Sequence, residues 1–313
     1  LIYWLSQPMS SAFSGIEAPG VARACIAEAV FARTGRRVVP VTTSTIEIDK
    51  DAQQELLVHP AGIHGCVYDD LNDFYVPALQ PVVCQLLKTP AKAYAVLKPS
   101  IVAGVAVRAE ATCVRHGRRC KFLPAHCHIA GTCCQDHSDF CGRLALAGEG
   151  TPAFLAWLCL RLLLHEEQIN QEHVKSFPPS ILFEFLCHFY HIEICTLDGA
   201  QFAIPQHRER QYVMMRHKLK SLWQRSPLSV FVTRLHCQSV TSWIVFADAS
   251  VDEIEAELRW ALHRPESRAN TEKMNLAEIT IDTPDAFELA LNDMETKILA
   301  GYRRLYQPVN GEP

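Results

Sequence analysis

Residues 128–140, with the sequence HIAGTCCQDHSDF, join a short apolar run to a cluster of reactive side chains. The run ends in Gly131 and Thr132, which is typical of a buried strand that arrives at a loop. Two thiols, an amide, a carboxylate and an imidazole follow within the next five residues. In an open α/β sheet, ligands bind just beyond the carboxyl ends of the strands. We therefore expect this loop to carry chemistry, although adjacent cysteines after a strand also serve as packing residues.

Expected strands and helices alternate on both sides of this stretch. The expected strands span residues 9–14, 38–48, 66–68, 169–174, 192–197 and 211–215, and the expected helices span residues 21–33, 51–58, 152–164 and 177–188. Residues 74–107 have a largely helical pattern. Several strands end in acidic residues, with a helix before the next strand, which is typical of a parallel, doubly wound sheet. We predict an α/β fold with a mostly parallel sheet of this kind.

The chain changes character after Arg216. Residues 217–225 are basic, residues 230–234 and 242–246 are expected strands, and residues 284–305 are an expected amphipathic helix. We therefore predict one domain in residues 1–225 and the start of a second region in residues 226–313.

The composition is that of a folded protein. Of 313 residues, 49% are hydrophobic and 20% are charged, and the net charge of -4 excludes a polybasic nucleic-acid binder. The most apolar window, residues 153–164, is too short to cross a bilayer. The start lacks a basic region and an initiator Met, so we interpret it as truncated and not as a signal peptide. An odd number of cysteines, 13, favours reduced thiols in an intracellular compartment.

The first expected strand leads into a glycine-containing turn and then a helix. Residues 15–20 (GIEAPG) form the turn, which opens a nucleotide-type βαβ unit. Glu47 ends the second strand, and its carboxylate could accept hydrogen bonds from both hydroxyls of a ribose. The turn alone would also suit a nicotinamide dehydrogenase, but a full G-x-G-x-x-G is missing.

Two further features could act together with a thiol of residues 133–134. Glu172 ends a later strand, and Gln206, Arg208 and Arg210 are spaced two apart, so they project from one face of an extended segment. Each has an ordinary alternative, a loop acid for Glu172 and a solvated charge cluster for the arginines. Together a thiol, a carboxyl group and a guanidinium suit attack on an electron-poor heterocycle.

A metal site is the competing interpretation of the cysteine-rich middle of the chain. The candidate ligands there are Cys113, His116, Cys120, His126, Cys127 and His128. Their spacing does not follow the paired C-x-x-C pattern of structural zinc sites, so we assign no metal ligand from the sequence.

Matched segments, in order from Phe13 to Arg210, resemble the motifs of the DNA (cytosine-5) methyltransferase family. They are residues 13–20 (FSGIEAPG), Glu47, Asp70-Leu71, residues 131–138 (GTCCQDHS), residues 172–174 (EHV) and residues 206–210 (QHRER). The first segment is similar to the Phe-x-Gly loop of the family, the fourth to Pro-Cys-Gln, the fifth to Glu-Asn-Val and the last to Gln-x-Arg-x-Arg. Single motifs of this kind are common, whereas several in one order, each at an expected strand end, are not.

The resemblance implies a fold, a cofactor and a set of roles. The fold is the Rossmann-like fold of S-adenosylmethionine-dependent methyltransferases, with the catalytic domain in residues 1–225 and an incomplete target-recognition region in residues 226–313. The cofactor is S-adenosyl-L-methionine, and the residues expected to bind it are Phe13, Gly15, Ile16, Glu47, Ile48, Asp70 and Leu71. The residues expected to act on the base are Cys134 as nucleophile, Glu172 as acid, Arg208 as ligand of the cytosine O2, and Gln206 and Arg210 as braces. We expect Cys134, Glu172 and Arg208 to surround one base-sized cavity facing an adenosine slot.

Two departures from the family pattern bear on activity. Cys133 stands where the family has proline, so the rigidity of a fixed φ is lost. His173 stands where the family has an asparagine that anchors the nucleophile loop, and an imidazole can replace only part of that role, in one tautomer. Reduced or lost activity is therefore one expectation.

The implied enzyme is a DNA (cytosine-5-)-methyltransferase that acts on a cytosine flipped out of duplex DNA, and its expected location is the nucleus. The basic segments 115–121 and 217–225 are candidates for phosphate contact or ordinary solvated surfaces. An RNA (tRNA) cytosine-5 methyltransferase is one alternative, because a flipped cytosine presents the same edge from either polymer. A decayed protein that only binds cofactor or DNA is the other.

Overall fold

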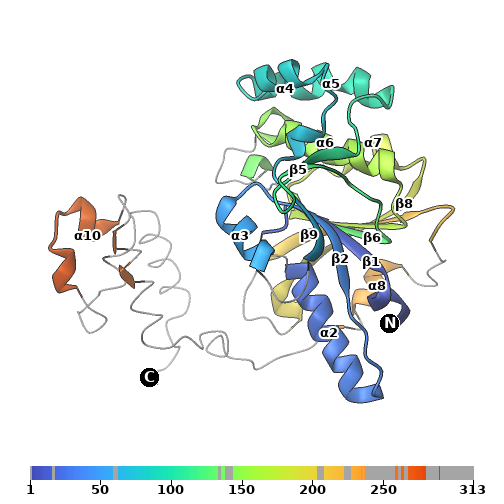
Figure 1. Cartoon of the computed structure of the whole chain (residues 1–313), viewed down its shortest axis with the longest axis horizontal. Helices are drawn as coiled ribbons and strands as arrows, with labels where there is room; N and C mark the ends of the chain where they lie inside the picture. Colours follow the sequence, from blue (N-terminus) through green and yellow to red (C-terminus); the bar gives the residue numbers. More distant parts are fainter. Residues whose placement is uncertain are drawn as a thin grey trace. The chain divides into compact units, whose positions relative to one another are not determined.

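The chain divides into two compact units, Leu1–Val240 and Thr241–Pro313 (Figure 1). The computed structural model describes residues 2–15, 18–58, 63–132, 135–137, 144–202, 208–221, 227–233, 235–236, 258–259, 262–263, 267–279 and 289. Each unit is treated by itself below, and the first contains all the expected functional residues.

The described part of the first unit is built on one nine-stranded sheet. Its strands are β1 (Pro8–Ala12), β2 (Val41–Ile46), β3 (Ile63–Tyr68), β4 (Glu110–Cys113), β5 (Arg118–Lys121), β6 (Cys127–Gly131), β7 (Gln168–Val174), β8 (Tyr190–Asp198) and β9 (Glu209–His217). They lie in the order β5-β4-β3-β2-β1-β6-β7-β9-β8. The central run β3-β2-β1-β6-β7 is parallel throughout, and β4, β5, β9 and β8 add antiparallel pairs at the two sides. This confirms the predicted doubly wound, Rossmann-like fold class.

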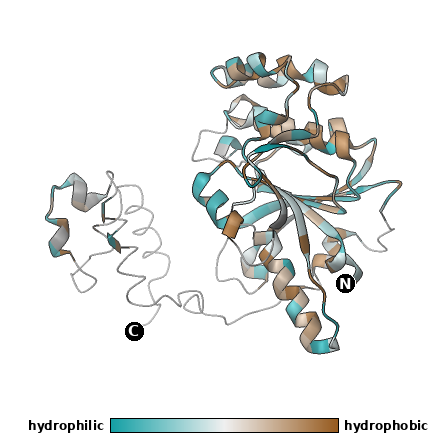
Figure 2. Ribbon diagram, in the orientation of Figure 1, coloured by the Kyte–Doolittle hydropathy of each residue, from teal (hydrophilic) through white to brown (hydrophobic). Residues whose placement is uncertain are grey.

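Helices cover both faces of the sheet. They are α1 (Ile2–Ser6), α2 (Ala18–Thr34), α3 (Lys50–Val58), α4 (Gln80–Leu86), α5 (Ala93–Val102), α6 (Thr151–Leu164), α7 (Ser180–Leu186) and α8 (Leu228–Thr233). In Figure 1, α6 and α7 lie on one face with α4 and α5 beyond them, and α2 lies on the other. Figure 2 colours α3 mostly as hydrophilic, which fits a helix that buries only Gln53 and Leu56.

The core centres on α6, which is apolar on nearly all sides. A helix of that pattern is expected to be buried, and Phe154 to Leu160 all are. The indole of Trp157 donates to Nε2 of His128 at 3.0 Å, and Nδ1 of the same ring bonds the Ser10 hydroxyl at 2.8 Å. Burial lowers the pKa of His128 well below its ordinary value, so this imidazole is neutral and joins β1, β6 and α6.

The sequence pattern was wrong in two places. Residues 230–234 were expected to form a strand because they are rich in Val, Phe and Thr, but Leu228–Thr233 is the helix α8. The carboxylate of Glu193 accepts from the Leu228 N–H at 2.6 Å, which favours a helix start there. The hairpin of β4 and β5 was missed, because each strand has only four residues. Residues 242–246 and nearly all of 284–305 lie outside the described part of the chain.

The second unit has its own small apolar cluster. Leu258, Leu262, Ala269 and Ile279 are buried together, and Ala269 lies in the short helix α10 (Arg268–Thr271). Among the described residues of both units, the helices are too short or too polar to cross a membrane.

Candidate active site

The sheet topology brings the expected functional residues to one edge. Parallel strands β1, β2, β3, β6 and β7 all present their carboxyl ends there. β9 runs antiparallel to β7, with Arg210 opposite Val174, so the beginning of β9 lies at the same edge. The chain order reverses between β1 and β6, and ligands of doubly wound sheets bind at such a switch point. The described residues gathered at this edge are Phe13, Gly15, Glu47, Ile48, Asp70, Leu71, Glu172, Arg208 and Arg210.

The turn after β1 is tied to the end of β2 by a carboxylate. Glu47, which is 9% exposed, accepts from the Gly15 N–H at 2.7 Å and from the Asp49 N–H at 2.9 Å. Phe13 has φ 53° and Gly15 has φ 50°. For a residue with a Cβ this conformation costs about 1–3 kcal/mol, and such strain clusters at functional sites. The turn is therefore held in shape by Glu47.

Three hydroxyl groups that the sequence analysis did not single out support the same turn. Ser11 donates to Thr45 at 2.8 Å, Thr45 donates to Ser14 at 2.6 Å, and Ser14 lies 2.9 Å from Ser11. Serine and threonine are too common at strand ends for this triangle to be predicted without the register of β1 on β2.

The residues of this turn and of the end of β2 could hold an adenosine group. A carboxylate has about four lone-pair sites, so Glu47 can accept two further hydrogen bonds, as from ribose hydroxyls. A Cβ added at Gly15 would meet no atom within 4 Å, so the turn is open on that side. The neighbouring Ile48 is 64% exposed and offers an apolar surface to a flat base.

The loop after β3 is held by a hydrogen bond to its own backbone. Asp70 accepts from the Asn72 N–H at 2.8 Å and so caps the short helix η1 (Leu71–Phe74). Burial, followed by the charge of Asp69, raises the pKa of Asp70. Leu71 is 4% exposed and packs in the core, so its main chain is the part available to a ligand.

Glu172 lies where β6, β7 and the turn after β1 meet. A Cβ added at Gly131 would lie 3.5 Å from Glu172 Oε2 and 3.6 Å from the Phe13 carbonyl oxygen. The other carboxylate oxygen, Oε1, forms an ion pair with Nε of Arg210 at 2.9 Å. Glu172 therefore has one oxygen held by Arg210 and the other over the end of the strand that precedes Cys134.

Tyr212 is a member of this group that the sequence analysis missed. It lies opposite Glu172 in the pairing of β7 with β9 and is 39% exposed. Burial and the charge of Glu172 raise the pKa of its phenol, while the charges of Arg210 and Arg208 oppose the rise. Arg208 itself is exposed at this edge.

The loop after β6 is described on both sides of its two cysteines. Thr132 accepts from the Gln171 amide at 2.7 Å, and Asp136 accepts from the Gly150 N–H at 2.7 Å. A Cβ at Gly148 would lie 1.9 Å from the Asp136 carboxyl carbon, so only glycine allows this approach. Cys133, Cys134, Gln206 and Ile16, all named from the sequence, lie outside the described residues.

His173 supports this loop through ring packing. It is 1% exposed, stands 4.1 Å from the Phe177 ring and 4.8 Å from the His137 ring, and accepts from the Val174 N–H on Nδ1. In the neutral ring the proton is then on Nε2. The Ser176 hydroxyl, on the turn after β7, donates a hydrogen bond to the His137 carbonyl of the loop. The sequence places Ser176 two residues past the expected motif, but it does not show which group this hydroxyl binds.

Comparisons with known proteins find similar solved structures but no match by sequence. No protein-family model matches the sequence, and no curated protein sequence matches it either. Similar solved structures include a Schizosaccharomyces pombe Dnmt2 methyltransferase, 14% identical with a TM-score of 0.40, covering 75% of this chain and 56% of its own. The Entamoeba histolytica methyltransferase EhMeth is 15% identical with a TM-score of 0.43, covering 80% and 64%. A Spodoptera frugiperda DNMT2 variant is 15% identical with a TM-score of 0.36, covering 71% and 53%. The chain thus spans roughly half to two thirds of the length of these proteins.

Proposed function

We propose that the chain carries the catalytic core of an S-adenosylmethionine-dependent methyltransferase that acts on C5 of cytosine in DNA. The observation that supports this best is the position of Glu172. Its carboxylate lies over Gly131, near the Phe13 carbonyl oxygen. The acid therefore lies next to both the strand that precedes Cys134 and the turn after β1. The order of the sequence motifs from Phe13 to Arg210 is the second support.

The first half of the edge is proposed to hold the cofactor. When bound, S-adenosylmethionine supplies an electrophilic methyl group. Glu47 accepts the ribose hydroxyls with its two remaining lone-pair sites, and Ile48 lies against the adenine. Asp70 and the main chain of Leu71 contact the adenine edge. The open side of Gly15 leaves room for a ligand close to the backbone.

The second half is proposed to activate the base. A cytosine inside a duplex cannot be reached, so it is flipped out at a cost of a few kcal/mol. The thiolate of Cys134 adds to C6, and the electron pair of the C5–C6 double bond moves toward C5. Glu172 donates a proton or hydrogen bond at N3, which is typically worth about 10² to 10⁴ in rate. Arg208 binds O2, where negative charge develops.

The addition makes C5 nucleophilic, which is what a methyl acceptor needs. Once C5 carries the methyl group, the proton on C5 is lost to water or to a base. The electron pair of that C–H bond restores the double bond, and the C6–S bond breaks to return the thiolate. Arg210 holds Glu172 in place during these steps and is a positioning residue, and we give Gln206 the same role. Residues 226–313 are proposed to belong to a region that recognises the target.

Covalent trapping tests this proposal. The chain is incubated with S-adenosylmethionine and a duplex that contains 5-fluorocytosine, which cannot lose a proton from C5, and the adduct is resolved on a denaturing gel. We expect an adduct with the parent chain and none with Cys134→Ser. Cys84→Ser, which removes an exposed cysteine on α4, is the matched control and should still form the adduct.

The other outcomes separate the alternatives. An adduct with fluorocytosine-containing tRNA and none with DNA would make the substrate RNA. Binding of S-adenosylmethionine, measured by calorimetry, without any adduct would indicate a decayed protein. If Cys133→Pro then restored the adduct, the lost rigidity of the nucleophile loop would be the cause.

A further inference from the structure

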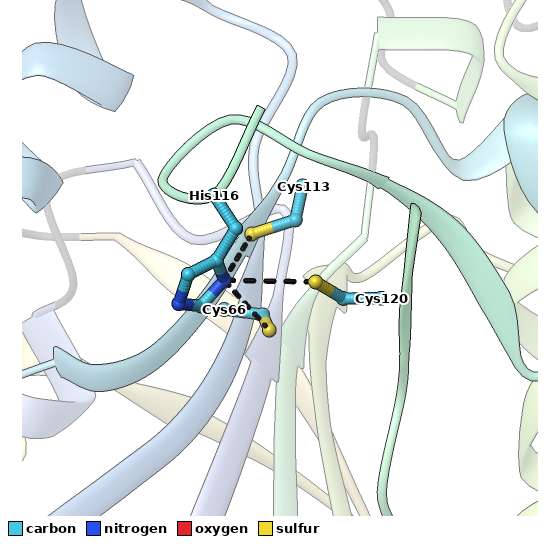
Figure 3. A group of neighbouring side chains, drawn as sticks. All are labelled: Cys66, Cys113, His116 and Cys120. Atoms are coloured by element: carbon cyan, nitrogen blue, oxygen red, sulfur yellow. Dashed lines mark hydrogen bonds between the residues drawn. The ribbon is translucent and has the colours of Figure 1, made fainter. Parts of the chain in front are cut away.

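Three thiols and one imidazole from separate segments converge at the outer side of β3 (Figure 3). Cys66 comes from β3, Cys113 from the end of β4, His116 from the turn after it, and Cys120 from β5. Nδ1 of His116 lies 3.3 Å from Cys113 Sγ and 3.6 Å from the Sγ atoms of both Cys66 and Cys120. All four ligand atoms lie within 4.8 Å of one another.

Hydrogen bonding does not account for this arrangement. Nδ1 of a neutral imidazole has either one lone pair or one N–H, so it can form one good hydrogen bond. Three sulfur atoms nevertheless surround it at nearly equal distances. Thiols are weak donors and acceptors, so bringing three together around one nitrogen gains little by itself.

A tetrahedral metal ion accounts for it directly. Zinc binds sulfur at about 2.3 Å and imidazole nitrogen at about 2.0–2.1 Å, which places ligand atoms of a tetrahedron roughly 3.6 Å apart. The three S–N distances of 3.3, 3.6 and 3.6 Å match this value. We propose that Cys66, Cys113, His116 and Cys120 bind one zinc ion as a Cys₃His site. The four protein ligands fill a tetrahedron and leave no position for a substrate or catalytic water, so the ion is structural.

The fold also indicates what the ion would do. β4 pairs with β3 through one register pair, Tyr68 with Cys113, so the β4–β5 hairpin is weakly joined to the sheet. An ion shared by Cys66 and the hairpin would cross-link the two. Asp73, on the loop after β3, is already bound by Arg119 of β5 at 2.8 Å and by the Thr112 N–H of β4 at 2.6 Å. The same hairpin therefore supports the loop that carries Asp70 and Leu71.

The ligand spacing explains why the sequence concealed the site. Cys113, His116 and Cys120 were grouped with His126, Cys127 and His128, which follow closely in the chain. The structure separates the two groups, because His128 is bound to Ser10 and Trp157 and His126 is paired with Glu167 at 2.9 Å. The fourth ligand, Cys66, comes from a strand far upstream. Gly117, with φ 60°, allows the tight turn that brings His116 back over β4 and β5.

Metal analysis of the full chain tests the proposal independently of any methyltransferase activity. The protein is expressed with zinc and purified without chelator, and its metal content is measured by mass spectrometry. We expect one zinc ion per chain, and on exchange with cobalt(II) the visible and near-ultraviolet bands of tetrahedral thiolate coordination. The double variant Cys66→Ser/Cys120→Ser should lose both signals. Cys25→Ser/Cys84→Ser removes the same number of thiols at exposed positions and should keep them.

A milder variant covers the case in which the double variant does not fold. His116 is exposed on a turn, so His116→Asn is expected to fold. Its zinc affinity, measured by competition with a chelating dye, should fall more than the ~10–100-fold typical of losing an outer-shell partner. Parent protein without zinc and without cobalt bands, or an intact mass showing a disulfide among these cysteines, would overturn the proposal. Unchanged affinity in His116→Asn would overturn the ligand set.

Discussion

The two halves of the carboxyl edge hold their acidic groups in different ways. On the side proposed to bind the cofactor, Glu47 is bound by the N–H groups of Gly15 and Asp49, and Asp70 by the N–H of Asn72. On the side proposed to bind the base, Glu172 forms an ion pair with Arg210, and their side chains are 34% and 21% exposed.

This difference separates a preformed site from an adjustable one. Backbone donors are fixed by the strands and turns, so Glu47 needs no reorganisation before a ligand arrives. A partly exposed ion pair contributes on the order of 0–1 kcal/mol and can rearrange at small cost. We therefore expect the cofactor half to bind its ligand without further change, and the base half to adjust when a base enters.

The largest effect that would test this contrast is expected from Glu172→Gln. The amide keeps the shape and can still accept from Arg210, but it cannot donate a proton to N3. Methyl transfer under single-turnover conditions should fall by about 10² to 10⁴, while the affinity for S-adenosylmethionine changes little. Glu209→Gln alters an exposed neighbour paired with Lys175 and should leave both quantities unchanged. A parallel loss of cofactor affinity in Glu172→Gln would break the division into halves.

A smaller effect, on the other half, is expected from Glu47→Ala. The variant removes the carboxylate that would accept two hydrogen bonds from the ribose, each worth about 1.5–3 kcal/mol, so cofactor affinity should fall at least ~100-fold. Calorimetric titration with S-adenosylhomocysteine measures it. Glu55→Ala, which removes an exposed acid on α3, is the control. Undiminished affinity in Glu47→Ala would place the ribose elsewhere.

The features predicted correctly from the sequence are those fixed by local pattern. Alternating apolar strands and helices predict a doubly wound sheet, and such a sheet places strand ends together whatever the loops do. That is why Glu47 and Glu172 could be assigned to one edge before their contacts were known. Their partners could not be predicted, because the pairing of Glu172 with Arg210 depends on the antiparallel register of β9 on β7.

The features missed depend on contacts between distant segments. Cys66 lies near Cys113 only because β3 pairs with β4. Residues 228–233 are helical beside Glu193 of β8 despite their strand-like composition. In both cases tertiary contacts outweigh the local signal. No periodicity in the sequence carries that information.

A still smaller effect on the base half is expected from Ser176→Ala. The Ser176 hydroxyl donates a hydrogen bond to the His137 carbonyl and so links the turn after β7 to the nucleophile loop. Its loss should lower the free energy of unfolding by about 0.5–1.5 kcal/mol. Hydrogen exchange should become faster in residues 135–137, while residues 13–15 on the cofactor side stay unchanged. Equal acceleration at both places would show that the two halves move as one.

The smallest effect is a pH dependence of the same loop. Burial lowers the pKa of His137 from its ordinary value near 6.5, although the neighbouring Asp136 opposes this. Its ring stands 4.8 Å from His173 and 5.0 Å from Phe177, so a charge there would be poorly hydrated. As the pH falls below about 6.5, the unfolded chain binds a proton at this residue before the folded chain does, so stability decreases with acidification. His137→Phe keeps the ring contacts and removes the titration. The free energy of unfolding, measured with urea between about pH 5 and 7, should then change less steeply with pH in the variant than in the parent. His128, His165 and His217 contribute equally to both proteins. Identical slopes would mean that the His137 ring is hydrated in the folded chain, and that the nucleophile loop is open to water on this side.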